Sequence, residues 1–184
     1  MVKMTVNFDK LVSIILDRGK NHRSITAIVG PPCSGKSTLA IDLCTRINSY
    51  KLDSADVLQM DGFHYDDIVL EKLGLLAKKG SPNTFDVSGF IAMLKRLFEN
   101  REKAIAVPVF DKQLEISRNS SNIIDKSVQH LIVEGNYLML KHKPWADLIK
   151  YYNTTIFMNI SLPTIRKRLE TRWKDLSEEL KEKK

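Results

Sequence analysis

Cysteine is scarce in this sequence of 184 residues, which contains only Cys33 and Cys44. Neither belongs to a CxxC pair, so the sequence predicts neither a disulfide framework nor a zinc site. No apolar run approaches the roughly 20 residues that a membrane-spanning helix requires. The first ten residues also lack the apolar centre of a secretory signal peptide. These absences predict a protein of the reducing cytoplasm that has no membrane partner.

Blocks of basic residues are also absent, although the formal net charge is +7. The lysines and arginines are scattered, whereas a nucleic-acid platform usually interleaves them with aromatic side chains. A solvated basic surface is therefore favoured, and no nucleic-acid partner is expected. A P-loop protein that acts on nucleic acid stays open as a weaker alternative, suggested only by the charge. The oligomeric state also stays open, a homo-oligomer included.

Internal repeats, low-complexity tracts and linkers are absent as well, so residues 1–184 are predicted to form one domain. Apolar runs predict strands over residues 24–29, 57–60, 105–110, 131–133 and 155–160. Helical periodicity and capping residues predict helices over residues 8–18, 36–47, 66–79 and 86–99, and one that begins at 161; residues 111–128 are predicted to be loop. Strands that alternate with helices are typical of a mostly parallel sheet covered on both faces, so an α/β fold is expected.

A glycine-rich segment follows the first predicted strand and opens the next predicted helix. It reads Gly30-Pro31-Pro32-Cys33-Ser34-Gly35-Lys36-Ser37 and matches G-x-x-x-x-G-K-[ST], the Walker A pattern. Such a loop aims backbone N–H groups at phosphates, and the helix N-terminus adds about half a positive charge. Lys36 is expected to reach the β- and γ-phosphates and assist their transfer, and the Ser37 hydroxyl to bind Mg²⁺. We therefore predict that residues 30–38, Thr38 included, bind ATP.

Two carboxylates come at the ends of other predicted strands, Asp61 after residues 57–60 and Glu134 after residues 131–133. Because parallel strands end at one edge of a sheet, both side chains are expected beside the phosphates. One of them can hold Mg²⁺, and the other can orient an attacking hydroxyl and take its proton.

Four further motifs follow the phosphate loop in order. They are Asp61-Gly62-Phe63-His64, Gly80-Ser81-Pro82-Asn83-Thr84-Phe85-Asp86, Pro108-Val109-Phe110-Asp111 and Val133-Glu134-Gly135-Asn136-Tyr137-Leu138. This set resembles the uridine kinase, pantothenate kinase and phosphoribulokinase group of P-loop kinases. Within the group it is most similar to an uncharacterised sugar- or nucleoside-kinase-like branch. The resemblance runs from Ile25 to Arg172. It implies a three-layer α/β/α P-loop NTPase fold, ATP and Mg²⁺ as cofactors, and a small-molecule hydroxyl as acceptor.

The resemblance also implies roles for single residues. Asp61 is expected to be the general base, and Glu134 to be associated with Mg²⁺. Asp86 is expected to touch the acceptor hydroxyls while it caps its own helix. Phe110 and His64 are expected to line the acceptor pocket. Uridine kinases have a tyrosine at the position of Phe110, so the missing hydroxyl weakens a uridine assignment.

A basic lid is implied over about residues 161–176, on the motif Arg168-Leu169-Glu170-Thr171-Arg172. The spacing of four places Arg168 and Arg172 on one helical face, where both can contact the transferring phosphate. Relatives continue beyond the lid with a strand and a helix that help to hold the adenine. This sequence ends at Lys184 without them, so that part of the family fold is expected to be missing.

The leading hypothesis is an ATP-dependent kinase whose acceptor is a sugar, a nucleoside or a pantothenate-like alcohol. The alternative is a nucleotide-binding switch or interaction module that transfers nothing. The Asn-Lys-x-Asp motif of small GTPases is absent from the sequence. Asp86-Val87-Ser88-Gly89 formally matches Asp-x-x-Gly, but its place at a helix start indicates coincidence. A preference for GTP over ATP would favour the switch.

Overall fold

A computed structural model describes residues 4–182, and of residues 175–182 only the backbone. The first three and last two residues of the predicted domain lie outside this description. The longer elements, in chain order, are α1 (Phe8–Arg18), β1 (Ser24–Val29), α2 (Lys36–Tyr50), β2 (Ala55–Gln59), α3 (Asp67–Lys72), α4 (Val87–Glu99), β3 (Ala104–Asp111), β4 (Ile116–Asp125), β5 (His130–Gly135), β6 (Thr154–Phe157) and α5 (Leu162–Glu182). Four short 3₁₀ helices join them: η1 (Met60–Phe63), η2 (Leu76–Lys78), η3 (Pro82–Thr84) and η4 (Trp145–Tyr151).

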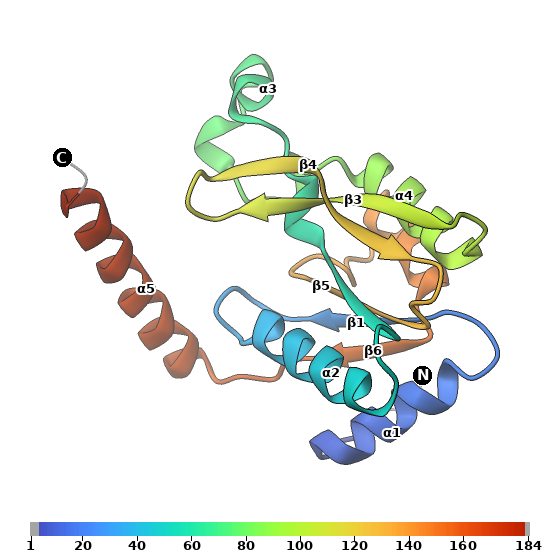
Figure 1. The fold of residues 1–184 in the computed structure, drawn as a ribbon. Helices are drawn as coiled ribbons and strands as arrows, with labels where there is room; N and C mark the ends of the chain where they lie inside the picture. The colour runs from blue at the N-terminus through green and yellow to red at the C-terminus, as the bar shows by residue number, and fades with distance from the viewer. Residues whose placement is uncertain (1–3, 183–184) are drawn as a thin grey trace.

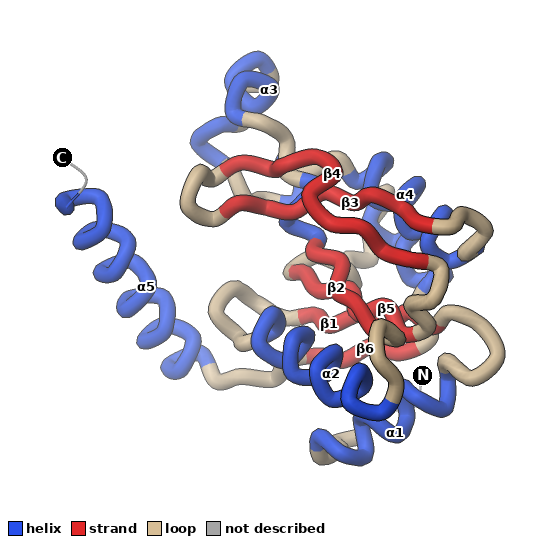
Figure 2. Tube along the Cα trace, viewed as in Figure 1, coloured by secondary structure: helices blue, strands red, loops and turns tan. Residues whose placement is uncertain are grey.

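The centre of the molecule is a parallel sheet of four strands in the order β2-β5-β1-β6 (Figure 2). In its register Glu134 of β5 lies level with Ile28 of β1 and with Gln59 of β2. The carboxyl ends of these strands therefore meet at one edge of the sheet. The mostly parallel sheet predicted from the alternating elements is confirmed.

Both faces of the sheet are covered, which gives the three layers expected (Figure 1). Alternate residues of β1 face opposite sides, so Ile28 packs against α1 and α2 while Ile25 and Val29 pack on the other side. The second side is covered by α4, η4 and the β3–β4 hairpin. Because β1 and β5 are buried along their whole length, they appear in the sequence as largely apolar runs.

The β3–β4 hairpin differs from the prediction of a loop over residues 111–128, which is wrong. β4 pairs antiparallel with β3, from Ala104 opposite Asp125 to Asp111 opposite Ile116. Most side chains of β4 are exposed, so the strand is polar and lacks the alternation that identifies a half-buried strand. β3 itself was expected as a strand, but it belongs to this separate sheet and not to the parallel one.

The helix predicted over residues 66–79 is shorter than expected, since α3 ends at Lys72 and η2 follows after Gly74, whose φ is 66°. The caps predicted at Asn7 and Asp86 are confirmed, because their side chains accept hydrogen bonds from the backbone N–H groups of Lys10 and Gly89. Within the described residues no helix combines the length and apolarity needed to cross a bilayer.

Candidate active site

The phosphate loop joins β1 to α2 at the carboxyl edge of the sheet. Gly35 precedes the helix with φ of 91°, in the left-handed region that favours glycine. This turn directs the first N–H groups of α2, which have no intrahelical acceptor, into the space above the loop. The backbone is thus arranged as an anion cradle, as the motif predicts.

Ser34 gives an independent indication of what this cradle holds. Its hydroxyl is buried and has no hydrogen-bond partner among the described residues. A buried hydroxyl without a partner is unfavourable, and Ser34 lines the cavity above the loop. A phosphate oxygen in the cradle would supply the missing acceptor. The loop therefore fits the phosphates of a nucleotide.

Lys36 is held within this loop and is only 7% exposed. Its ammonium donates a hydrogen bond of 2.8 Å to the carbonyl oxygen of Pro31. Burial lowers the pKa of Lys36, while the nearby carboxylates of Glu134 and Asp61 act in the opposite direction. The ammonium is poorly solvated, which strengthens its attraction for phosphate oxygens.

Glu134 lies across from the start of α2, where the Ser37 hydroxyl donates a hydrogen bond of 3.0 Å to its Oε1. Burial raises the pKa of Glu134, and Asp61 adds to the rise; Ser37, Lys36 and Lys112 oppose it. Within the described residues no group of three or more metal-ligating side chains occurs. A hydroxyl and one carboxylate nevertheless fit Mg²⁺, which usually takes its other ligands from phosphates and water.

Asp61 lies in η1, just beyond the end of β2, and lines the same cavity as Glu134. η1 packs closely on the hairpin, since a Cβ added to Gly62 would come within 2.6 Å of the carbonyl oxygen of Pro108. His64 Nδ1 lies 2.9 Å from the carbonyl oxygen of Asp61. Because a carbonyl can only accept, this nitrogen carries a proton, and in the neutral ring Nε2 is then an acceptor.

The aromatic residues expected around the acceptor lie side by side. The His64 ring lies 4.9 Å from the Phe110 ring and 3.9 Å from the Phe85 ring, measured between centroids. Phe110 lines the cavity directly, whereas His64 lies behind it. Asp86 caps α4 through Gly89 and is not among the residues that line the cavity. Its predicted contact with acceptor hydroxyls stays a prediction.

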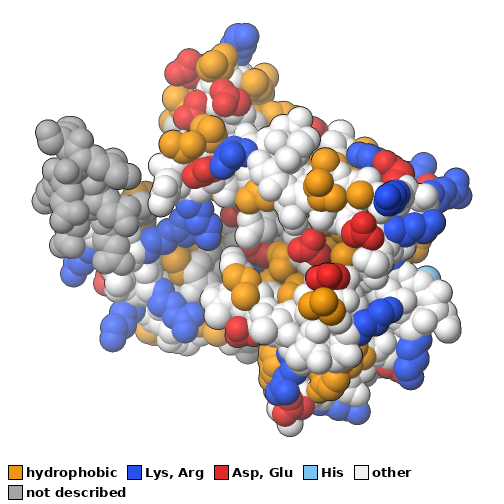
Figure 3. Space-filling view, in the orientation of Figure 1, with side chains coloured by type: hydrophobic (Ala, Val, Ile, Leu, Met, Phe, Trp, Pro, Cys, Tyr) orange, Lys and Arg blue, Asp and Glu red, His pale blue; other side chains and the backbone are white. Residues whose placement is uncertain are grey.

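The predicted lid corresponds to the beginning of α5, which projects away from the body of the molecule (Figure 1). Arg168 contacts the phosphate loop, where its Nη1 donates a hydrogen bond of 3.2 Å to the carbonyl oxygen of Cys33. Arg172, one turn further on, lines the same cavity. Lys and Arg side chains gather in the hollow between α5 and the body (Figure 3).

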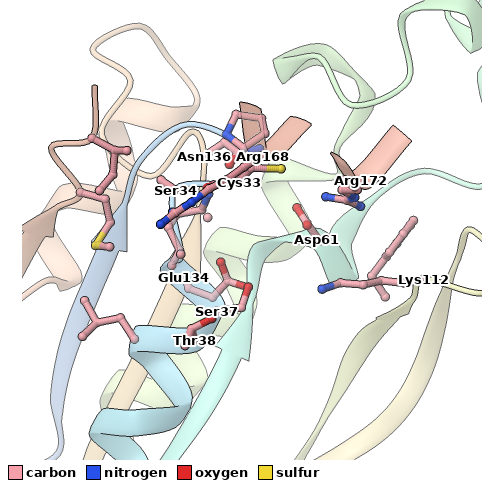
Figure 4. A pocket seen from close by; sticks show the side chains of 18 of the residues that line it. Cys33, Ser34, Ser37, Thr38, Asp61, Lys112, Glu134, Asn136, Arg168 and Arg172 are labelled. Atoms are coloured by element: carbon pink, nitrogen blue, oxygen red, sulfur yellow. The ribbon is translucent and has the colours of Figure 1, made fainter. Parts of the chain in front are cut away.

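These groups surround one cavity of about 710 Å³ (Figure 4). It brings together most of the predicted site residues, namely Pro32, Cys33, Ser34, Gly35, Lys36, Ser37, Thr38, Asp61, Phe110, Glu134, Arg168 and Arg172. Gly30 and Pro31 belong to the first part of the phosphate loop and do not line the cavity. The cavity is also lined by residues that the sequence analysis did not identify, among them Asp42, Lys112, Asn136, Met158 and Ile160. Of these, only Asn136 could have been proposed from the sequence, since it belongs to the motif that contains Glu134 and Gly135.

No family model matches the chain. Individual kinases are nevertheless similar to it in sequence or in structure. A crystal structure from Silicibacter sp. TM1040, assigned as a fructose transport system kinase, is 32% identical with a TM-score of 0.86. The match covers 94% of this chain and 84% of that chain. A Schizosaccharomyces pombe protein assigned as a uridine kinase is 27% identical over 172 residues, which are 90% of this chain and 73% of that protein.

A pantothenate kinase from Rhodopseudomonas palustris strain TIE-1 is 31% identical over 150 residues. The match covers 77% of this chain and 46% of that kinase. The chain thus spans about half the length of the curated pantothenate kinases that it matches.

Proposed function

Because the chain belongs to the P-loop kinases, in the group of uridine kinase and pantothenate kinase, it is a kinase, and we propose that ATP with Mg²⁺ donates its γ-phosphate here to a hydroxyl of a sugar, a nucleoside or a pantothenate-like alcohol. One observation carries the proposal. The phosphate loop and the carboxylates of Asp61 and Glu134 line a single cavity at the carboxyl edge of the parallel sheet.

The nucleotide side of the cavity is assigned to the loop and Lys36. The N–H groups at the start of α2 and the Ser34 hydroxyl would bind phosphate oxygens, and the Lys36 ammonium would bridge the β- and γ-phosphates. Ser37 and Glu134 would hold Mg²⁺, which neutralises phosphate charge when bound. The raised pKa of Glu134 fits this role, because a neighbouring cation restores the ionised form.

The acceptor side is assigned to Asp61 and Phe110. The Asp61 carboxylate would accept a hydrogen bond from the acceptor hydroxyl, align it with the γ-phosphorus, and take its proton as the new O–P bond forms and the bond from the γ-phosphorus to the bridging oxygen of the leaving ADP breaks. Phosphoryl transfer has a loose transition state, so alignment and charge stabilisation supply most of the catalysis. Arg168 and Arg172 face the same space from α5 and would stabilise the charge on the transferring group.

His64 packs against Phe110 behind the lining of the cavity and is proposed to contact the acceptor as well. With Nδ1 donating to the carbonyl oxygen of Asp61, Nε2 is the ring nitrogen left to form a hydrogen bond with a second hydroxyl of the substrate. The carboxylate of Asp86 is proposed to contact the acceptor as well, in addition to capping α4.

A coupled ADP-release screen over sugars, nucleosides and vitamin precursors tests the proposal. ADP release should be slow with ATP and Mg²⁺ alone and should rise when the right acceptor is added. Lys36→Met should abolish the rise, and Lys20→Met, before the start of β1 at the opposite edge of the sheet, should not. If nucleotide binds tightly and no acceptor accelerates its turnover, the protein is a nucleotide-binding switch instead.

The cytoplasm is the proposed compartment, since Cys33 and Cys44 are both free thiols and the reaction requires cellular ATP. Fractionation of cells that express the native chain tests this. The substrate is proposed to be a small molecule and not a nucleic acid. Retardation of DNA or RNA by the protein at physiological salt would contradict that part of the proposal.

A further inference from the structure

Lys112 has no role in the proposed reaction so far, although it lines the active-site cavity. It is the first residue after β3, at the turn of the hairpin that also carries Phe110. It therefore reaches the cavity from the side of the acceptor and not from the phosphate loop. Figure 4 shows its amino group directed into the space that Asp61 and Glu134 also face.

The neighbouring acid, Asp111, does not neutralise this ammonium. Its Oδ1 accepts hydrogen bonds of 3.0 and 3.1 Å from the backbone N–H groups of Gln113 and Leu114, and its Oδ2 lies 3.4 Å from Arg118. Among the side chains that the structure describes, none forms a hydrogen bond or an ion pair with the Lys112 ammonium. Lys112 thus presents to the cavity an ammonium that is held by no hydrogen bond or ion pair of the described residues, although Glu134 attracts it at longer range.

The turn that carries Lys112 is fixed from two sides. Asp111 folds it internally through the two backbone contacts just described. Lys79 holds it from outside, since its ammonium donates hydrogen bonds of 2.7 Å to the carbonyl oxygen of Glu115 and 2.6 Å to Asp67. A fixed turn keeps the backbone of Lys112 beside the cavity, so that only the side chain has to be ordered when an anion binds.

The phosphate side of the cavity already has its own cations. Lys36 lies inside the loop, and Arg168 contacts the loop at Cys33. An acceptor with a negative charge would be repelled by Asp61 unless a cation lay beside it. Lys112 is placed to supply that cation, and it is close enough to Glu134 and Lys36 to act on both.

We propose that Lys112 binds an anionic group of the phosphoryl acceptor, so that the substrate is an alcohol that carries a carboxylate or a phosphate. The inference rests on the proposed kinase function and narrows its substrate class. It disfavours free sugars and nucleosides relative to hydroxy acids and sugar phosphates.

The test compares matched acceptors that differ in one charged group. The carboxylate pairs are D-glycerate with glycerol and pantothenate with panthenol. The phosphate pairs are fructose 6-phosphate with fructose and ribose 5-phosphate with ribose. In the wild-type protein we expect the charged member of at least one pair to react with a kcat/KM at least about tenfold higher, the value of one charge-assisted contact. If the preference appears in a carboxylate pair, the anionic group is a carboxylate, and if it appears in a phosphate pair, the group is a phosphate.

Lys112→Met should bring the ratio of kcat/KM for the charged acceptor to that for its neutral partner close to one, mainly through a higher KM for the charged acceptor. Lys112→Arg should restore most of the preference because it keeps the charge. Lys103→Met, at the other end of the same hairpin, is the matched control and should behave as wild type. An equal fall in kcat for both members of a pair would overturn the proposal, since it would place Lys112 on the transferring phosphate.

A binding measurement separates this inference from the proposed function. Calorimetry first records the binding of AMP-PNP with Mg²⁺, and the charged and neutral acceptors are then titrated into the saturated protein. Failure to bind AMP-PNP would overturn the kinase proposal itself. If AMP-PNP binds but charged acceptors bind no better than their neutral partners, the kinase proposal stands and the anionic acceptor is rejected.

Discussion

At the scale of single residues, Glu134 shows a conflict between stability and function. Burial raises the pKa of this carboxyl, and Asp61 raises it further. The native state therefore holds the proton more tightly than the unfolded state. The free energy of unfolding of the metal-free protein then contains a contribution that falls as pH rises from the ordinary glutamate pKa through the raised one.

Glu134→Gln should consequently be more stable than wild type at pH 8 in the absence of metal and nucleotide. The difference in Tm should shrink on acidification and disappear below the ordinary pKa of 4.5, where the carboxyl is protonated in both states. Thermal unfolding of both proteins across this pH range checks the result. A difference that does not vary with pH, or a less stable variant at pH 8, would contradict it. The Mg²⁺-dependent reaction should be lost in the same variant.

Asp61 has a different role, because its proposed task is alignment of the acceptor and not metal binding. Asp61→Asn keeps the size of the side chain and removes the acceptor of the proton. We expect transfer to fall by about 100-fold or more, with AMP-PNP affinity nearly unchanged. The measurements are coupled ADP release and calorimetry, with the exposed Asp17→Asn as control. Full activity of Asp61→Asn would show that the assignment of the base is wrong.

The sequence predicted this pair of carboxylates for a physical reason. Both follow apolar runs directly, and parallel strands end at one edge of the sheet whatever their order. Lys112 could not be found in this way. It belongs to a turn between antiparallel strands, and one of those strands was interpreted as loop, so nothing in the local pattern places it in the cavity.

At the scale of elements, a single buried arginine ties the end of the β3–β4 hairpin to α4 and to the segment before β5, in addition to the apolar contacts of the hairpin with the core. Arg23 is 3% exposed and donates hydrogen bonds to the carbonyl oxygens of Val128, Leu97 and Asp125, at 2.7, 3.0 and 2.6 Å. These three residues lie before β5, in α4 and at the end of β4. One guanidinium thus joins the helix and the hairpin that together cover one face of the sheet.

Arg23→Leu should leave these carbonyls without their donor and destabilise the protein by about 3 kcal/mol. Urea unfolding checks the magnitude, and Arg18→Leu on the surface of α1 is the control. A loss below about 0.5 kcal/mol, the usual size for a surface substitution, would mean that the three contacts contribute little. At low temperature, where the variant stays folded, its kcat/KM should be close to wild type because the cavity is distant.

The elements themselves were predictable where burial dominates. β1 and β5 are mostly apolar because both faces are covered, and α1 and α4 begin at caps formed by Asn7 and Asp86. β4 was missed because its pairing depends on β3 and not on its own pattern. The prediction of one helix over residues 66–79 was wrong because Gly74 has a positive φ, which a continuous helix cannot contain.

At the scale of the whole molecule, the order β2-β5-β1-β6 could not be derived from the sequence, because it depends on contacts between distant segments. This order places the phosphate loop of β1 next to Glu134 of β5, with Asp61 one strand further on. α5 then faces the loop across the cavity, with the hairpin on the remaining side (Figure 4). Phosphates bound in the loop would therefore attract the Lys36 ammonium from α2 and the guanidinium groups of Arg168 and Arg172 from α5.

α5 should become more ordered when a nucleotide binds, because bound phosphates attract both Arg168 and Arg172 while the free protein has one contact from Arg168 to the loop. With AMP-PNP and Mg²⁺ at about 100 times Kd, global stability should rise by about 2.7 kcal/mol, and amide exchange in residues 162–174 should slow beyond what this global gain explains. The double variant Arg168→Met with Arg172→Met should lose the protection of α5 but keep that of residues 34–38. Lys167→Met on the same helix should retain both. Equal protection of α5 in the double variant would mean that these arginines do not respond to the phosphates, and the lid assignment would then be wrong.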